Sequence, residues 1–147
     1  DLDLLGFGDP DAERLGGVFR ALCGAAVPDD GLLFDAGSVE VRPIREEQEY
    51  GGQRVTLQAR LGSARVDMQV DVGFGDAITP AAEAVEFPTL LGMDRPRLRA
   101  YPRETVVAEK LEAMVSLGLA NSRMKDFYDV VVLARSFPFT GPVLVEA

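Results

Sequence analysis

Two strictly alternating segments joined by a two-residue turn restrict the fold of this chain more than any other part of its sequence. Residues 54–60 and 65–71 each alternate polar and apolar side chains, with Gly62-Ser63 between them. Glycine first in a two-residue connection is typical of a type II′ β-hairpin. The alternation predicts an antiparallel pair with one apolar and one polar face, as in a sheet that helices cover on one side.

The turn also determines which residues face each other across the hairpin. On the apolar face we expect the pairs Ala59/Val66, Leu57/Met68 and Val55/Val70. On the polar face we expect Arg60/Arg65, Gln58/Asp67, Thr56/Gln69 and Arg54/Asp71. Taken alone, the last pair is best interpreted as a cross-strand ion pair on a solvated surface.

The first residues, Asp1-Leu2-Asp3-Leu4-Leu5, alternate as well, which predicts a strand with Asp1 and Asp3 on one face. Neighbouring carboxylates repel each other, and a divalent cation relieves that repulsion. The alternative for so short a pattern is a frayed, solvated terminus. Further along, we expect a helix over residues 11–23, a loop-rich stretch over 27–37, a short strand over 39–44 interrupted by a proline, and an acidic loop over 46–50.

The lysines mark a second unusual region. Of the 15 basic residues only Lys110 and Lys125 are lysines, and they lie in successive predicted helices after a proline-punctuated connection over 79–102. A helix over 104–117 places Lys110 within its apolar stripe, where an ammonium must reach solvent, pair with a buried carboxylate or face an anion in a cavity. The structural alternative to a functional site is a buried ion pair between the helices plus an i,i+4 pair between Lys125 and Asp129.

Composition excludes several kinds of site. The chain has no histidine, which excludes histidine acid–base catalysis and histidine–cysteine zinc sites, and its single cysteine excludes a disulfide framework. No apolar run approaches the roughly 20 residues of a membrane helix, and nothing indicates secretion, so we expect a cytoplasmic protein without membrane contact. The net charge of −9 opposes general affinity for nucleic acid.

Four segments together resemble the AbiEii/AbiGii-type nucleotidyltransferase toxins. Residues 1–5 are similar to the Asp-x-Asp strand of the nucleotidyltransferase fold, and residues 70–76 to the strand with its third carboxylate. Residues 104–111 and 123–129 are similar to the two later motifs, and all four follow the family's order. The resemblance implies an α+β fold. Residues 1–100 would form a mixed sheet with helices packed on one face, and 101–147 a helical segment that packs on this core and completes the site.

The resemblance implies metal-dependent transfer of a nucleotidyl group from a nucleoside triphosphate to an acceptor hydroxyl, with RNA or tRNA as the expected acceptor. Asp1, Asp3 and Asp71 would hold one or two Mg²⁺ (or Mn²⁺) ions. Asp71 would also deprotonate or orient the acceptor hydroxyl. All three would lie on the polar face of the sheet.

The later motifs would supply the nucleotide-binding residues. The resemblance implies that Lys110 neutralises charge on the triphosphate, and that Asp126 either orients Lys110 or touches the nucleotide. Lys125 would bind the nucleotide from the edge of the site. Asp129 would also be a nucleotide-binding residue, and it is the less favoured alternative to Asp126 as the functional carboxylate. A cognate antitoxin encoded beside the toxin, and a role in abortive infection as phage defence, are further implications.

Two other functions stay open. One is a non-catalytic nucleotide- or partner-binding module with the same fold, and the other is an α+β domain whose acidic clusters are surface ion pairs. The family's glycine-rich, phosphate-contacting turn precedes the Asp-x-Asp strand and would lie ahead of Asp1. Because the chain begins inside an expected strand, we interpret it as an internal fragment and expect catalysis of the full-length chain.

Overall fold

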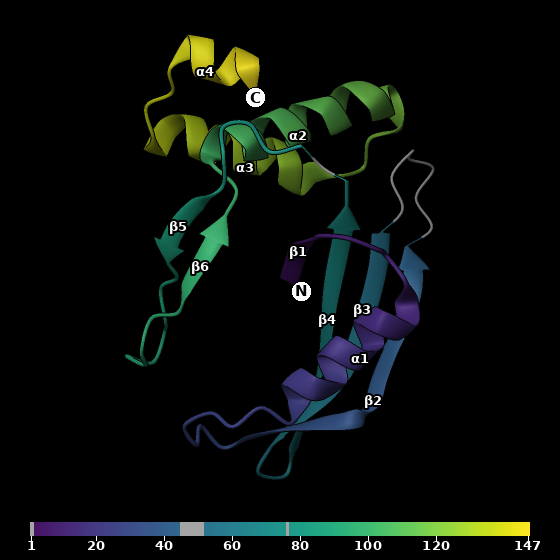
Figure 1. Ribbon diagram of the computed structural model, residues 1–147. Coiled ribbons are helices and arrows are strands. Elements are labelled where there is room, and N and C mark those ends of the chain that lie inside the picture. Colours follow the sequence, from purple (N-terminus) through teal and green to yellow (C-terminus); the bar gives the residue numbers. More distant parts are fainter. Residues whose placement is uncertain (1, 45–51, 76) are drawn as a thin grey trace. The chain divides into compact units, whose positions relative to one another are not determined.

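A computed structural model describes residues 2–44, 52–75 and 77–147 (Figure 1). It divides into two compact units, residues 1–76 and 77–147, whereas the sequence placed a boundary at residue 100. The described chain combines helices with a mixed β-sheet, so the predicted α+β class is confirmed.

The sheet belongs to the first unit, which contains β1 (Leu2–Gly6), helix α1 (Ala12–Cys23), β2 (Leu32–Ile44), β3 (Gly52–Leu61) and β4 (Ala64–Phe74). Its strand order is β1-β4-β3-β2. Strand β1 runs parallel to β4, and the other neighbours are antiparallel. Segments from the beginning and the end of this unit therefore lie side by side in the sheet (Figure 1).

The β3–β4 hairpin has the predicted register at every pair, from Arg54 opposite Asp71 to Arg60 opposite Arg65. Gly62 has a φ of +58°, and no described residue other than glycine has a positive φ. A positive φ at the first turn position alone is the requirement of a type II′ turn. The hairpin prediction is confirmed.

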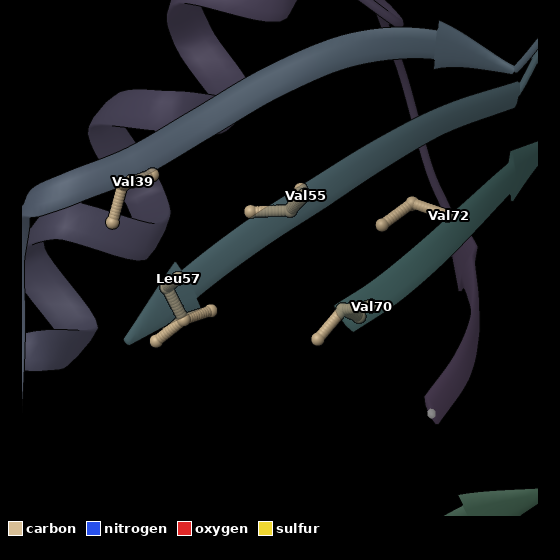
Figure 2. Close-up of a cluster of buried hydrophobic side chains, with 5 residues drawn as sticks. All are labelled: Val39, Val55, Leu57, Val70 and Val72. Carbon is tan, nitrogen blue, oxygen red and sulfur yellow. The ribbon is translucent and has the colours of Figure 1, made fainter. Parts of the chain in front are cut away.

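The core lies on one face of this sheet. Figure 2 shows its buried side chains, which come from β2, β3 and β4: Val39, Val55, Leu57, Val70 and Val72. Helix α1 packs Leu15, Phe19 and Cys23 against them. Side chains alternate along a strand, so the residues between these core positions, including Arg54 and Asp71, point to the opposite face. We call that opposite face the polar face.

Strand β2 is longer than predicted, since it begins at Leu32 instead of residue 39. Its register with β3 shifts between Asp35 and Glu40, where the Asp35 carboxylate accepts a hydrogen bond from the Gly37 backbone N–H at 2.9 Å. This irregularity interrupts the alternation on which the prediction depended. Pro43 is tolerated because β2 lies at an edge of the described sheet. The acidic loop predicted over 46–50 lies outside the described residues.

The second unit begins with a hairpin that the sequence did not predict. Strands β5 (Glu83–Glu86) and β6 (Arg97–Ala100) pair antiparallel within the segment predicted as a connection. Each strand has four residues, with Pro88 and Pro96 close by, which is too short for alternation to be recognised. Helix α2 (Arg103–Leu117), the 3₁₀ turn η1 (Gly118–Ala120), α3 (Met124–Ser136) and α4 (Gly141–Glu146) follow.

Contacts inside the second unit hold the start of α2 in place. Pro102, just before the helix, is fully buried, and the buried Thr105 hydroxyl donates to the Thr79 carbonyl at 2.8 Å. The Arg103 guanidinium lies 4.5 Å from the centre of the Phe137 ring beyond α3, a cation–π contact. Helices α2 and α3 also pack against each other, and this packing positions the lysine-bearing face of α2 against α3.

Candidate functional site

Two predicted metal ligands lie directly opposite each other in the sheet. Asp3 on β1 is in register with Asp71 on the adjacent parallel strand β4. Residues in register on neighbouring strands point to the same face, and such strands lie about 4.8 Å apart. Asp3 and Asp71 therefore share the polar face, as the predicted acidic site requires. Asp1, the third predicted ligand, lies outside the described residues, and the role of all three as metal ligands stays a prediction.

The Asp71 carboxylate is held by a guanidinium from β3. Arg54 Nε donates to one carboxylate oxygen at 2.8 Å and Nη2 donates to the other at 2.7 Å. This confirms the cross-strand pair expected from the hairpin register. The Arg54 hydrogen bonds lower the pKa of Asp71, because they stabilise its ionised form more than its partial burial opposes it. Asp71 is consequently an anion throughout the physiological pH range.

This pair should stabilise the folded chain only at pH values above the acidic range. The folded pKa of Asp71 lies below its ordinary value of 3.8, so the contribution is present above that value and is lost as pH falls through the lowered pKa. In Arg54→Gln, the free energy of unfolding should depend less on pH below about 4 than in the wild type. Denaturant titration across this range measures the slopes. Arg65→Gln, which removes the exposed Arg65–Asp67 pair, should keep the wild-type slope; an Arg54→Gln slope equal to wild type would contradict the assignment.

The donor chemistry of the polar face fits a divalent cation. Asp3 and Asp71 offer carboxylate oxygens, the ligands that Mg²⁺ and Mn²⁺ prefer. Within residues 2–44, 52–75 and 77–147, no three carboxylate or thiol groups gather closely enough to hold a metal, so among the described residues only these two aspartates are candidate ligands. Both oxygens of Asp71 already accept from Arg54, and an incoming cation would have to share or displace that guanidinium.

The second cluster joins α2 to α3. Lys110 Nζ lies 3.1 Å from Asp126 Oδ1 and 2.8 Å from Asp129 Oδ2. The Asp126 side chain is only 6% exposed and that of Lys110 20%. Of the alternatives for a lysine within an apolar stripe, the structure therefore shows pairing with a buried carboxylate. Asp129 forms its ion pair with Lys110. The part of the chain that the structure describes contains no Lys125–Asp129 pair. The structural alternative from the sequence is therefore confirmed for the buried ion pair between the two helices and wrong for the Lys125–Asp129 pair. Lys125 is exposed.

Arg123 completes this cluster, and the sequence analysis missed it. Its Nε lies 2.7 Å from Asp126 Oδ2, with the i,i+3 spacing of neighbours on one helical face. That oxygen nevertheless has no well-aligned hydrogen bond from any described residue. Asp126 thus lies between two cations, Lys110 and Arg123. The i,i+3 spacing was the signal in the sequence that would have identified the contact.

The lysine is charged at neutral pH. Burial lowers the pKa of Lys110, but hydrogen bonds to Asp129 and Asp126, together with their negative charge, outweigh it and raise the pKa overall. Those carboxylates engage two of the three ammonium donors, and the described residues offer Lys110 no further acceptor. Lys110 is therefore a positioned cation that retains one hydrogen-bond donor.

A mixed sheet with paired aspartates on the face opposite its covering helix is the arrangement expected of a nucleotidyltransferase. The chain belongs to the family described as "Nucleotidyl transferase AbiEii toxin, Type IV TA system", whose model matches residues 1–147. This confirms the family inferred from the four ordered motifs. Comparisons with curated proteins and with solved structures find no match.

Membership of the family defines the general activity and one partner class. Its description is that of a nucleotidyl transferase toxin of a type IV toxin–antitoxin system, and an antitoxin is the implied partner. No helix among the described residues is long and apolar enough to cross a membrane. Whether the aspartates of the first unit and Lys110 of the second serve one reaction stays a prediction.

Proposed function

We propose that this protein transfers a nucleotidyl group from a nucleoside triphosphate to an acceptor hydroxyl, in the cytoplasm, with the help of Mg²⁺ or Mn²⁺. The observation that carries the proposal is the in-register pair of Asp3 and Asp71 on the polar face. Two adjacent carboxylates on an exposed sheet face repel each other unless a cation lies nearby. Such a pair is well suited to holding the ion that accompanies a triphosphate.

Asp1, Asp3 and Asp71 would hold the ion on the polar face. When bound, it would neutralise charge on the phosphate oxygens and favour in-line displacement. Asp71 is a weak proton acceptor while Arg54 holds it, because its pKa is lowered. That supports Asp71 as an oxygen ligand that also orients the acceptor hydroxyl, with deprotonation following only after Arg54 has moved away.

Lys110 would stabilise the triphosphate as negative charge develops on the departing phosphates. Two of its ammonium donors are held by Asp126 and Asp129, so its position is set before the nucleotide binds. This supports a role for Asp126 in orienting Lys110, whereas the partly exposed Asp129 and the exposed Lys125 would contact the nucleotide at the edge of the site. Preorganised cations of this kind require no rearrangement at the moment of reaction.

RNA, and tRNA in particular, is the acceptor class that we propose. The net charge of −9 supplies no general attraction to it, so recognition would depend on a localised surface. The second candidate function is a nucleotide- or partner-binding module without turnover. It is favoured by Arg54, which donates to both oxygens of a predicted metal ligand.

Incorporation of radiolabel separates the two functions. The protein is incubated with total RNA or purified tRNA, Mg²⁺ and each α-³²P-labelled nucleoside triphosphate in turn. Label that becomes covalently attached to RNA, and that requires the divalent cation, is the expected result. Nucleotide binding in equilibrium dialysis without transfer to RNA or to protein would support the binding module and overturn the proposed reaction.

A further inference from the structure

One row of charged residues crosses the whole described sheet on its polar face. Asp3 is in register with Asp71, Asp71 with Arg54, and Arg54 with Arg42. The row therefore reads acid, acid, base, base from β1 to β2. Because neighbouring strands lie about 4.8 Å apart, the two arginines lie at increasing distance from the acidic pair.

The two arginines make different contacts. The Arg54 guanidinium donates one hydrogen bond to each carboxylate oxygen of Asp71, at 2.8 and 2.7 Å, and so forms a bidentate pair. Arg42 instead pairs with Glu40 on its own strand at 2.7 Å. Arg54 is thus the guanidinium that neutralises the acidic pair, and Arg42 is an equally charged neighbour one strand farther away.

The Arg54–Asp71 pair is open enough to be exchanged. The Arg54 side chain is 44% exposed and that of Asp71 is 24% exposed, so water can replace the contacts that either side chain loses. Ion pairs at such exposure are weak. A divalent cation carries twice the charge of a guanidinium and needs the same carboxylate oxygens, so the two compete directly for Asp71.

We propose that Arg54 is an exchangeable counterion: it holds Asp71 in the absence of a divalent cation, leaves it when the cation binds, and then donates its fork to the phosphate oxygens of the nucleotide. A guanidinium suits both positions, because its planar fork matches carboxylate and phosphate alike. This inference rests on the proposed function, since it assumes the ion at Asp3 and Asp71.

The test compares two binding reactions in the wild type, Arg54→Met and Arg42→Met. Mn²⁺ alone is titrated first, by calorimetry and by the loss of its free-ion electron paramagnetic resonance signal. Arg54→Met should bind Mn²⁺ about fivefold more tightly, because the competitor is gone. The Mn²⁺ affinity of Arg42→Met should stay within about twofold of the wild type. This variant removes the same charge, but from a position one strand farther from the acidic pair.

Inorganic tripolyphosphate is titrated next, at saturating Mn²⁺. Here Arg54→Met should bind about tenfold more weakly than the wild type, since a charge-assisted fork is lost. Exchange thus predicts tighter Mn²⁺ binding and weaker tripolyphosphate binding in Arg54→Met. A purely structural role of Arg54 would weaken both binding reactions or neither. Arg54→Gln repeats the comparison with a polar side chain, and circular dichroism verifies the fold of every variant.

Equal Mn²⁺ affinity in the wild type and the Arg54 variants would overturn the inference, as would absence of Mn²⁺ binding from all of them. Weaker binding of both probes would also overturn it. None of these results decides the proposed function, because transfer of label to RNA is measured separately. Conversely, the two opposite changes without label transfer would support Arg54 exchange and count against the reaction.

Discussion

Lys110→Met should abolish nucleotidyl transfer and at the same time destabilise the protein by about 2–3 kcal/mol. The loss of activity follows from removing the positioned cation, which we expect to cost about 10²–10³ in rate. The loss of stability follows from the burial of Asp126, whose side chain is 6% exposed and would keep only Arg123 as a cationic partner. Label transfer to RNA and denaturant titration measure the two effects.

A double variant separates those effects. In Lys110→Met/Asp126→Asn the buried charge is removed together with its partner, so most of the lost stability should return while transfer stays absent. Lys125→Met is the matched control for stability, because Lys125 is exposed and its loss should change the unfolding free energy by less than about 0.5 kcal/mol. Transfer by Lys110→Met close to the wild-type rate would remove Lys110 from the mechanism.

Asp71→Asn and Asp3→Asn should each eliminate the stabilisation of the protein by nucleoside triphosphate and Mg²⁺. At a ligand concentration about a hundred times the dissociation constant, the wild-type melting temperature should rise by about 5–10 °C. Each variant removes one of the two described carboxylates that we propose to hold the cation, so the rise should disappear and label transfer should disappear with it.

Asp67→Asn is the matched control for this experiment. Asp67 lies on the same strand and the same polar face as Asp71, but it pairs with Arg65 at 3.3 Å and is largely exposed. Its variant should keep the rise in melting temperature and the transfer activity. A rise that persists in Asp71→Asn, or one that needs no divalent cation, would contradict the proposed metal site.

The parts of the fold that sequence predicted correctly are those with a strict local pattern. The β3–β4 register followed from the alternation and from Gly62, whose positive φ suits the turn. The start of β2 was missed because the irregularity after Asp35 interrupts the alternation. The β5–β6 hairpin was missed because its four-residue strands carry no recognisable period.

The site was predictable to a similar extent. The alternation in the Asp-x-Asp segment placed Asp3 on the face that it shares with Asp71 in the structure. The position of Lys110 within an apolar stripe indicated a buried ion pair between the helices. It did not identify Asp129 as a second partner of Lys110. Asp129 could have paired with Lys125 or Lys110 at the level of sequence, and only the packing of α2 against α3 selects Lys110. Side chains of neighbouring helices are brought together by tertiary contacts that spacing along one helix does not determine.

The parallel pairing of β1 with β4 means that the acidic pair can form only after nearly the whole first unit has been synthesised. The β3–β4 hairpin joins residues close in sequence and closes quickly, whereas β1 must wait for a strand from the far end of its unit. A ribosome-bound chain that has not yet extended beyond β3 holds Asp3 without Asp71. Completion of the sheet, and not of either strand alone, is therefore what brings the two proposed metal ligands together.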